Sequence, residues 1–265
     1  MESGAMNSPD PDRKPIISLR HVSKTYKAGK GSVLAVDDVD LDIPAREFVS
    51  VLGPSGCGKS TLLRIIGGLH SYEGEAVEID GVEVDGPSAK SAVVFQKNNL
   101  LPWLSVESNL RLGAKIRRVP EADIRDRVAA MIRILGLEDF AHSHPHQLSG
   151  GMQQRVSLGQ ALILNPEILL LDEPFGALDA LTRDRLNLEL LRIWEEQKQT
   201  VFLVTHSISE AVFLSDRVVV MTPRPGRIMH DVKVDLPHPR SVKETRANPR
   251  YVELVNQLSE YMGVV

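Results

Sequence analysis

An eight-residue segment, Gly53-Pro54-Ser55-Gly56-Cys57-Gly58-Lys59-Ser60, constrains this chain more than any other feature. It matches the pattern G-x-x-x-x-G-K-[ST] in full. It follows the apolar run Phe48–Leu52 and precedes Ser60–Leu69, in which apolar residues recur at helical spacing. Glycines let the backbone wrap tightly, so that several N–H groups point inward, and the N-terminal end of the next helix adds positive potential. The segment therefore predicts a phosphate-binding loop between a strand and a helix.

The last residues of this loop carry the side chains that would meet phosphates. Lys59 supplies a point charge for the β- and γ-phosphates, and Ser60 offers a hydroxyl to Mg²⁺. For Cys57 we expect a contact through the backbone and no catalytic role for the thiol. The loop does not identify the class of P-loop NTPase, because kinases, GTPases and motor ATPases share it.

Composition excludes several other classes of protein. The 265 residues have a formal net charge of -4, so bulk electrostatics do not favour nucleic-acid binding. The single cysteine cannot form an internal disulfide. Apolar runs such as Ile168–Leu171 are far shorter than the roughly 18 residues of a membrane span, so any work at a membrane would require a partner. The polar segment 1–15 predicts a disordered leader and not a secretion signal.

Apolar periodicity predicts an α/β fold. Short β-like runs at Ile16–Leu19, Ala35–Ile43 and Phe48–Leu52 come first, and a hairpin is expected over Glu75–Val84. Later, predicted strands and helices alternate over Ile168–Leu171, Leu181–Gln197, Thr200–Val204, Ile208–Leu214 and Arg217–Met221. Such alternation is typical of a parallel sheet covered by helices.

The residues from about 98 to 164 have a different pattern. Helical periodicity runs over Val106–Ile116, Glu121–Leu135 and Met152–Leu164, with prolines and a glycine between these segments. We therefore expect a mostly helical subdomain at this point of the chain. The chain ends with a proline-bearing tail and an amphipathic segment, Tyr251–Met262.

Two adjacent acids, Asp172 and Glu173, follow the predicted buried strand Ile168–Leu171. A buried parallel strand delivers its last residues to the carboxyl edge of the sheet, where ligands bind. Asp172 would hold Mg²⁺, directly or through water, and Glu173 would be the general base for an attacking water. The alternative is a strand that simply exits into solvent; the phosphate-binding loop upstream favours the catalytic interpretation.

The segment Leu148-Ser149-Gly150-Gly151-Met152 lies between these two features. A serine and two glycines at a helix start offer a hydroxyl and bare N–H groups to an anion, although an ordinary serine N-cap has the same residues. With the loop before it and the acids after it, the segment resembles the signature sequence of ABC ATPases. The resemblance runs from about Ile16 to Met221. It implies an α/β P-loop NTPase of the ABC-ATPase fold: a RecA-like, mostly parallel sheet core, an antiparallel β subdomain and an inserted α-helical signature subdomain.

The resemblance implies an ATPase domain over residues 16–231, with the helical subdomain at about 98–164, and a C-terminal extension over 232–265. It implies ATP and Mg²⁺, with the metal on Ser60, Gln96 and Asp172. Two chains would close head to tail, so that the signature of one covers the ATP of the other. The residues expected to bind ATP within one chain are Tyr26, Gly53, Pro54, Ser55, Gly56, Cys57, Gly58, Lys59, Ser60 and Thr61. Those expected to reach the partner's ATP are Leu148, Ser149, Gly150, Gly151 and Met152.

Four further positions match motifs of the family. Tyr26 resembles the aromatic that stacks on adenine, although a single tyrosine on a strand is more often plain packing. Gln96 resembles the glutamine that contacts Mg²⁺ and the attacking water, and Asp179 resembles the acid of the loop that crosses the dimer interface. His206 resembles the switch histidine that senses the γ-phosphate. The implied catalytic set is therefore Glu173, His206 and Gln96.

Some positions depart from the family or admit a second interpretation. Gln160 stands where many relatives have arginine, and Ser207 stands where aspartate is frequent, so local ion pairs would be weaker. The three histidines within residues 142–146 are not spaced as in a zinc site, which favours a solvated loop. The apolar stretch Leu100–Leu104 could be core packing, but its position in the family favours a docking groove for a helix of a membrane subunit.

Four segments have sequences that resemble those of importer subunits for nitrate, sulfonate, taurine and bicarbonate: Leu101–Trp103, Pro145–Arg155, Asp172–Ala180 and Pro225–Ile228. We therefore expect an ATP-hydrolysing subunit that energises the import of such a small anion by ATP-driven dimer closure. The implied partners are a second copy, two integral-membrane permease subunits and, indirectly, a solute-binding protein, with no nucleic acid. The implied location is peripheral, at the cytoplasmic face of the bacterial inner membrane.

Other members of the family share much of the sequence of these segments. Importers of osmoprotectants, polyamines, molybdate or thiamine precursors are alternatives, and so is a separate ATPase chain of an exporter. A soluble ABC-type ATPase of translation or DNA repair is less compatible with the sequence. Translation members carry two such domains in one chain and repair members insert a long coiled coil, and neither feature occurs here.

Overall fold

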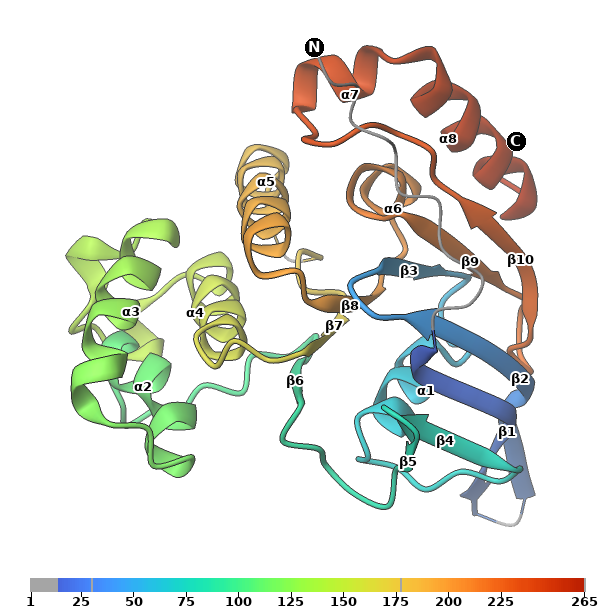
Figure 1. The fold of residues 1–265 in the computed structure, drawn as a ribbon, viewed down its shortest axis with the longest axis horizontal. Helices are drawn as coiled ribbons and strands as arrows, with labels where there is room; N and C mark the ends of the chain where they lie inside the picture. The colour runs from blue at the N-terminus through green and yellow to red at the C-terminus, as the bar shows by residue number, and fades with distance from the viewer. Residues whose placement is uncertain (1–13, 30, 177, 265) are drawn as a thin grey trace.

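The larger of two sheets has six strands and carries the centre of the fold (Figure 1). The computed structural model describes residues 14–29, 31–176 and 178–264. The strand order is β10-β9-β3-β8-β7-β6, and all neighbours pair in parallel except β10, which is antiparallel to β9. The bounds are β3 (Phe48–Leu52), β6 (Ser91–Val94), β7 (Ile168–Asp172), β8 (Thr200–Val204), β9 (Arg217–Met221) and β10 (Ile228–Lys233). The expected mostly parallel core is confirmed.

The smaller sheet is antiparallel, as the resemblance implied, with the order β2-β1-β4-β5. Its strands are β1 (Pro15–Ala28), β2 (Gly31–Pro44), β4 (Ala76–Ile79) and β5 (Val82–Glu83). β1 and β2 are much longer than the sequence predicted. The pairing of β1 with β2 shifts register on both sides of Val22, and His21 and Asp38 adopt left-handed φ values of 49° and 52°. Such bulges interrupt the alternation by which strands are recognised in a sequence.

Helix α1 (Lys59–Ile66) lies between the two sheets and is buried from both sides (Figure 1). Leu62, Leu63, Ile65 and Ile66 are each 0% exposed and pack against strands of both sheets. At roughly 1.5–3 kcal/mol for each fully buried aliphatic side chain, this packing fixes the helix that follows the phosphate-binding loop. The loop is therefore held from behind by the core.

The opposite face of the large sheet is covered by α5 (Ala180–Gln197) and α6 (Ile208–Leu214), and α7 (Val242–Ala247) and α8 (Pro249–Tyr261) form a further layer (Figure 1). The last layer is firmly attached: Tyr251, Leu254 and Leu258 are buried in the core on this side. The buried Arg240 donates to the carbonyl oxygens of Val212 and Phe213 in α6. The segment expected as a C-terminal extension is thus part of the packed fold, and β10 runs across the expected boundary at 231/232.

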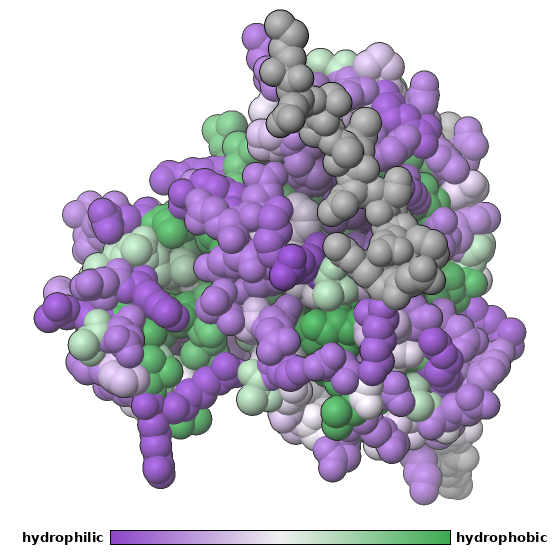
Figure 2. Space-filling view, viewed as in Figure 1, coloured by the Kyte–Doolittle hydropathy of each residue, from purple (hydrophilic) through white to green (hydrophobic). Residues whose placement is uncertain are grey.

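A helical region between β6 and β7 lies to one side of the sheets (Figure 1). It contains α2 (Val106–Ile116), α3 (Glu121–Ile134), η1 (Glu138–Phe140), η2 (Pro145–Gln147) and α4 (Gly150–Leu162). All three helices were predicted, and α4 starts two residues earlier than expected. Over the described residues, no helix has both the length and the apolar character needed to cross a membrane. The face drawn in Figure 2 is mostly hydrophilic, with hydrophobic residues in separate patches.

Residues 1–13 of the predicted leader lie outside the described part of the chain, and Pro15 already belongs to β1.

The direction of the parallel strands determines where the predicted site residues lie. The carboxyl ends of β3, β6, β7 and β8 lie at one edge of the large sheet, and the chain after each of them carries a predicted site residue.

Candidate functional site

The turn from β3 to α1 wraps as its glycines predicted. Gly56 and Gly58 have φ values of +77° and +108°, a region that residues with side chains rarely adopt. A Cβ on Gly58 would lie 2.6 Å from the carbonyl oxygen of Ala35, so only glycine lets the turn approach β2 this closely. α1 then begins without a side-chain cap. The backbone N–H groups of its first turn are therefore available to an anion.

Lys59 is held across this turn. Its side chain is buried, and Nζ donates to the carbonyl oxygens of Gly53 at 2.7 Å and Pro54 at 3.0 Å. Gly53 and Pro54 thus contribute through backbone carbonyls. Cys57 is also buried, with Sγ at 4.0 Å from Nζ of Lys59. The ammonium is positioned by the turn itself before any ligand arrives.

Ser60 and Asp172 meet behind the turn. Ser60 Oγ donates to Asp172 Oδ1 at 2.6 Å, and Asp172 is only 1% exposed. Burial raises the pKa of this carboxyl, while the Ser60 hydrogen bond and the Arg64 guanidinium, 3.9 Å from Oδ2, act in the opposite direction. Asp172 Oδ2 is buried and has no hydrogen-bond partner among the described residues.

A buried carboxylate oxygen without a partner is costly, and a bound cation would remove that cost. Hydroxyl, carboxylate and amide oxygens are the donors that Mg²⁺ prefers. Ser60 and Asp172 therefore fit the metal that the sequence implied. Gln96 uses its Nε2 to donate a hydrogen bond to Glu173, so its amide oxygen is available as a third metal ligand.

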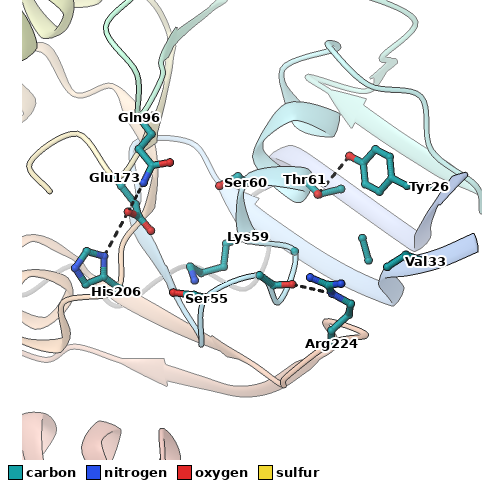
Figure 3. Close-up of a pocket in the computed structure, with 13 residues that line it drawn as sticks. Tyr26, Val33, Ser55, Lys59, Ser60, Thr61, Gln96, Glu173, His206 and Arg224 are labelled. Carbon is teal, nitrogen blue, oxygen red and sulfur yellow. Dashed lines mark hydrogen bonds and ion pairs between the residues drawn. The ribbon is translucent and has the colours of Figure 1, made fainter. Parts of the chain in front are cut away.

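Three side chains from different strand ends meet next to this pair (Figure 3). Gln96 Nε2 donates to Glu173 Oε2 at 2.9 Å, and His206 Nδ1 lies 3.4 Å from the same oxygen. The backbone N–H of Glu173 donates to the carbonyl oxygen of Val204 at 2.9 Å, which fixes the carboxylate relative to β8. The predicted catalytic residues are thus brought together at the carboxyl edge of the sheet.

A cavity of about 590 Å³ joins these groups to the phosphate-binding turn (Figure 3). Its lining contains ten of the predicted residues: Tyr26, Ser55, Gly56, Gly58, Lys59, Ser60, Thr61, Gln96, Glu173 and His206. Val33, Ala35 and Arg224 also line it and were not predicted. The first two lie on a strand whose polar and apolar alternation indicates no ligand. The only signal for Arg224 was the Pro-Gly turn that follows it.

Tyr26 closes the end of the cavity away from Glu173 (Figure 3). Its hydroxyl donates to Thr61 Oγ1 at 3.3 Å and lies 2.7 Å from His70 Nδ1, and the His70 ring meets the Tyr26 ring edge-on at 5.8 Å. Burial lowers the pKa of His70, and nearby Arg64 and Lys24 add to this effect. The tyrosine ring is therefore anchored at its hydroxyl beside the α1 residue Thr61.

The signature segment forms a separate cavity of about 300 Å³ with the start of α5. Ser149 caps α4 by accepting from the N–H of Met152, and Asp179 caps α5 by accepting from the N–H of Thr182. This last hydrogen bond lowers the pKa of Asp179. The lining is Ser149, Gly151, Met152, Arg155, Leu178, Asp179 and Thr182, none of which lines the larger cavity. Within one chain the two predicted anion-binding features are apart.

The departures from the family pattern have local substitutes. Gln160 Nε2 donates to the carbonyl oxygen of Asn109 at 2.9 Å, so a neutral hydrogen bond stands at the position where many relatives have an arginine. Ser207 caps α6 by accepting from the N–H of Glu210. In the stretch Leu100–Leu104, Leu100 packs on the core whereas Trp103 is 69% exposed, so this stretch is only partly accounted for by packing.

Comparison with known proteins places these features in a family. The family model described as "ABC transporter" matches residues 36–176. An aliphatic sulfonates import ATP-binding protein of Bacillus cereus is 42% identical over 250 residues, covering 94% of this chain and 98% of the relative. A taurine import ATP-binding protein of Rhizobium johnstonii is 44% identical over 250 residues (92% and 95%). A nitrate import ATP-binding protein of Synechococcus elongatus is 41% identical over 244 residues (91% and 89%).

Solved structures agree with the fold. A dimeric structure of an ATP-binding cassette in a post-hydrolysis state, bound to ADP and Pi, has a TM-score of 0.75 and 36% sequence identity. The match covers 83% of this chain and 100% of that one. The expected ABC-ATPase fold is therefore confirmed.

Proposed function

This chain belongs to the ABC transporter family as an ATP-hydrolysing subunit, and we propose that it energises the import of a small sulfonate or a chemically related anion such as nitrate or bicarbonate. One observation carries the catalytic part of the proposal. A single cavity is lined by the phosphate-binding turn, by Ser60 and by the Gln96–Glu173–His206 group, and Asp172 lies behind Ser60, hydrogen-bonded to it. These are the parts that phosphoryl transfer to water requires: a phosphate cradle, metal donors and a base.

Each part has a role set by its position. The backbone N–H groups of the turn and the ammonium of Lys59 would bind the β- and γ-phosphates, and the Tyr26 ring at the far end would stack on adenine. Ser60, Gln96 and Asp172 would hold Mg²⁺, which when bound supplies charge neutralisation on the phosphate oxygens. Oδ2 of Asp172 supports this assignment, because it is buried, accepts no hydrogen bond from the described residues and has the Arg64 guanidinium no nearer than 3.9 Å.

Glu173 would take a proton from the attacking water. It lies beside the cavity and is oriented by its own backbone and by the amide of Gln96. His206, on the other side of the same carboxylate oxygen, would stabilise the reacting phosphate with its ring N–H. Because the carboxylate is fixed before the reaction, little reorganisation is needed in the transition state.

The signature segment would act on the ATP of a second copy. In one chain it faces its own cavity with Asp179, apart from the ATP cavity. A C₂ dimer closed head to tail would bring each signature onto the other chain's phosphates. The dimeric form of the solved cassette with ADP and Pi supports this arrangement.

Import requires a link to membrane subunits. We propose that two permease subunits dock on this chain, one on each copy, at the exposed Trp103 and its neighbours. The chain would then sit at the cytoplasmic face of the membrane as a peripheral subunit, and an extracytoplasmic solute-binding protein would select the cargo. The names of the relatives support a small anion, because aliphatic sulfonates, taurine and nitrate all carry negatively charged oxygens.

The test is to purify the tagged full chain from detergent-solubilised membranes of the source cells and identify co-purifying chains by mass spectrometry. A multi-span permease should appear together with MgATP-dependent phosphate release. Deleting the gene should then abolish growth on taurine or another sulfonate as sole sulfur source. Normal growth on sulfonates with lost growth on nitrate would mean that the cargo is nitrate and not a sulfonate. Capture of ribosomal or repair proteins without any permease would overturn the transport role.

A further inference from the structure

The loop from Thr222 to Arg227, between β9 and β10, lies along the phosphate-binding turn. Arg224 Nε donates to the carbonyl oxygen of Gly56 at 3.1 Å (Figure 3). The N–H of Gly226 donates to the carbonyl oxygen of Ala35, and the N–H of Asp37 donates to that of Gly226, both at 3.0 Å. The loop is thus hydrogen-bonded both to the turn and to β2.

The approach of this loop is unusually close. A Cβ on Gly226 would lie 2.0 Å from the carbonyl oxygen of Cys57 and 2.7 Å from the methyl carbon of Met221. A Cβ on Gly56 would lie 3.0 Å from Nη2 of Arg224. Two glycines, one on each side, therefore allow the arginine to sit against the turn. Arg227, three residues beyond Arg224, instead pairs with Asp37 at 2.5 Å.

Charge distinguishes Arg224 within the cavity. Among the described residues of its lining, Lys59 and Arg224 are the two with permanently cationic side chains, and Glu173 is the acid. The Lys59 ammonium already donates to two backbone carbonyls. Arg224 uses Nε for the turn, and its Nη1 and Nη2 donate to no described residue. A guanidinium held by one edge presents two terminal amino groups in a fixed fork, which suits phosphate oxygens.

We propose that Arg224 is an additional nucleotide-binding residue, whose terminal amino groups contact the phosphate oxygens of the bound nucleotide. This inference rests on the proposed ATP site. It assigns Arg224 two functions: Nε holds the phosphate-binding turn at Gly56, and the Nη groups add a second positive charge to the cavity that Lys59 also lines. Because the contact is charge-assisted but partly exposed, its loss weakens binding about tenfold, near the lower end for such hydrogen bonds.

The experiment measures ADP and ATP binding by calorimetry on the full chain carrying Arg224→Gln, Arg224→Lys or, as a matched control in the same loop, Arg227→Gln. Thermal unfolding without nucleotide is recorded for each. We expect the Kd for ADP to rise about tenfold in Arg224→Gln and about threefold in Arg224→Lys, and to stay within twofold in the control. We also expect the Arg224→Gln difference to shrink as NaCl is raised, because screening weakens an exposed charge contact.

Three results would overturn the inference in different ways. Unchanged ADP and ATP affinities in Arg224→Gln would show that the side chain does not contact nucleotide. Equal losses in the Gln and Lys variants, insensitive to salt and accompanied by a lower melting temperature, would reduce Arg224 to a structural clamp of the turn. Absence of nucleotide binding to the unaltered chain would overturn the proposed function itself, and with it this inference.

Discussion

The proposed mechanism depends on Glu173 more than on any other single residue. Its φ of +47° is unusual for a residue with a side chain. This conformation is held by the hydrogen bond of its backbone N–H and by the contacts of its carboxylate with Gln96 and His206. Backbone strain of this kind costs of order 1–3 kcal/mol and persists where the surroundings impose it. The carboxylate is therefore positioned by the fold and not by its ligand.

We expect Glu173→Gln to bind ATP with nearly normal affinity and to hydrolyse it at least about tenfold more slowly, because the amide keeps the volume but cannot accept the proton of water. Calorimetric binding and phosphate release would be measured side by side. Glu167→Gln, an exposed acid just before β7, is the control and should keep full turnover. Near-normal turnover in Glu173→Gln would remove Glu173 from the base role.

Glu47 offers a pH-dependent test far from the catalytic edge. Burial raises the pKa of this carboxyl to about 7, against the opposing effect of Arg217, 3.1 Å away. The folded state thus holds the proton more tightly than the unfolded chain, whose value is near 4.5. The associated stability is complete below pH 4.5 and is lost as pH rises through about 7.

We therefore expect Glu47→Gln, which stays neutral, to gain stability relative to the natural chain as pH rises from about 5 to about 8, by about 1–2 kcal/mol. Urea unfolding at several pH values measures this difference. Glu260→Gln, an exposed acid on α8, should show no such trend. A difference that falls as pH rises would mean that the ion pair with Arg217 outweighs burial.

The residues that the sequence could predict by their own chemistry belong to contiguous motifs, whereas single positions such as Gln96 and His206 were predicted only from the resemblance. The loop at 53–60 and the pair Asp172–Glu173 carry their chemistry in adjacent letters, so their meeting required only the parallel sheet. Arg224 and Val33 reach the same cavity through tertiary packing of a loop and an antiparallel strand. No local pattern specifies that packing, because it depends on glycines distant in sequence, such as Gly56.

At the scale of elements, buried helices and strands were predicted well and edges poorly. The apolar pattern is strong where an element is covered on both sides, as in helix α1 and the fully buried strand β7. The pattern is weak where one face of a strand is exposed to solvent and bulges interrupt the pairing, as in β1 and β2. Short connecting turns also depend on polar side chains whose role appears only in three dimensions.

Asn109 is such a side chain. It is 0% exposed on α2, accepts from the N–H of Leu101, and donates to the carbonyl oxygens of Leu101, Leu104 and Ser105. One side-chain amide thereby makes hydrogen bonds to the backbone on both sides of the exposed Trp103. The proposed docking surface is thus held by α2.

We expect Asn109→Ala to lower the free energy of unfolding by about 2–3 kcal/mol, because several buried backbone groups lose their partner. Urea unfolding followed by circular dichroism checks this value. Lys115→Ala, on the exposed face of the same helix, should change stability by less than about 0.5 kcal/mol. Loss of permease co-purification from Asn109→Ala, with ATP binding retained, would tie the loop to docking; an unchanged stability would contradict the buried network.

At the scale of the molecule, the fold places two anion-binding features in two cavities of one chain. The ATP cavity is built from strand ends of the large sheet, and the signature cavity is built where α4 meets α5. Sequence order alone could not show this separation, since Ser149 lies only 23 residues before Asp172 in the chain. In the proposed head-to-tail dimer, each copy would therefore supply half of each complete site.

That arrangement predicts complementation between two damaged copies. Lys59→Ala should prevent a chain from binding ATP, and Ser149→Arg should place a bulky cation where the N-cap of α4 meets the partner's phosphates. With Glu173→Gln added to both to block turnover, neither variant alone should dimerise with ATP. A mixture should form heterodimers, because the phosphate loop of one chain and the signature of the other are both intact.

The measurement is size-exclusion chromatography with light scattering, in MgATP, for each variant and for the mixture. The Glu173→Gln chain without further change is the positive control and should be dimeric in ATP and monomeric in ADP. The mixture has one intact composite site in place of two, so it should dimerise at a protein concentration well above that of the control. If the control dimerises and the mixture stays monomeric at every concentration tested, the signature does not act across the interface, and each chain would have to close its own signature onto its own nucleotide.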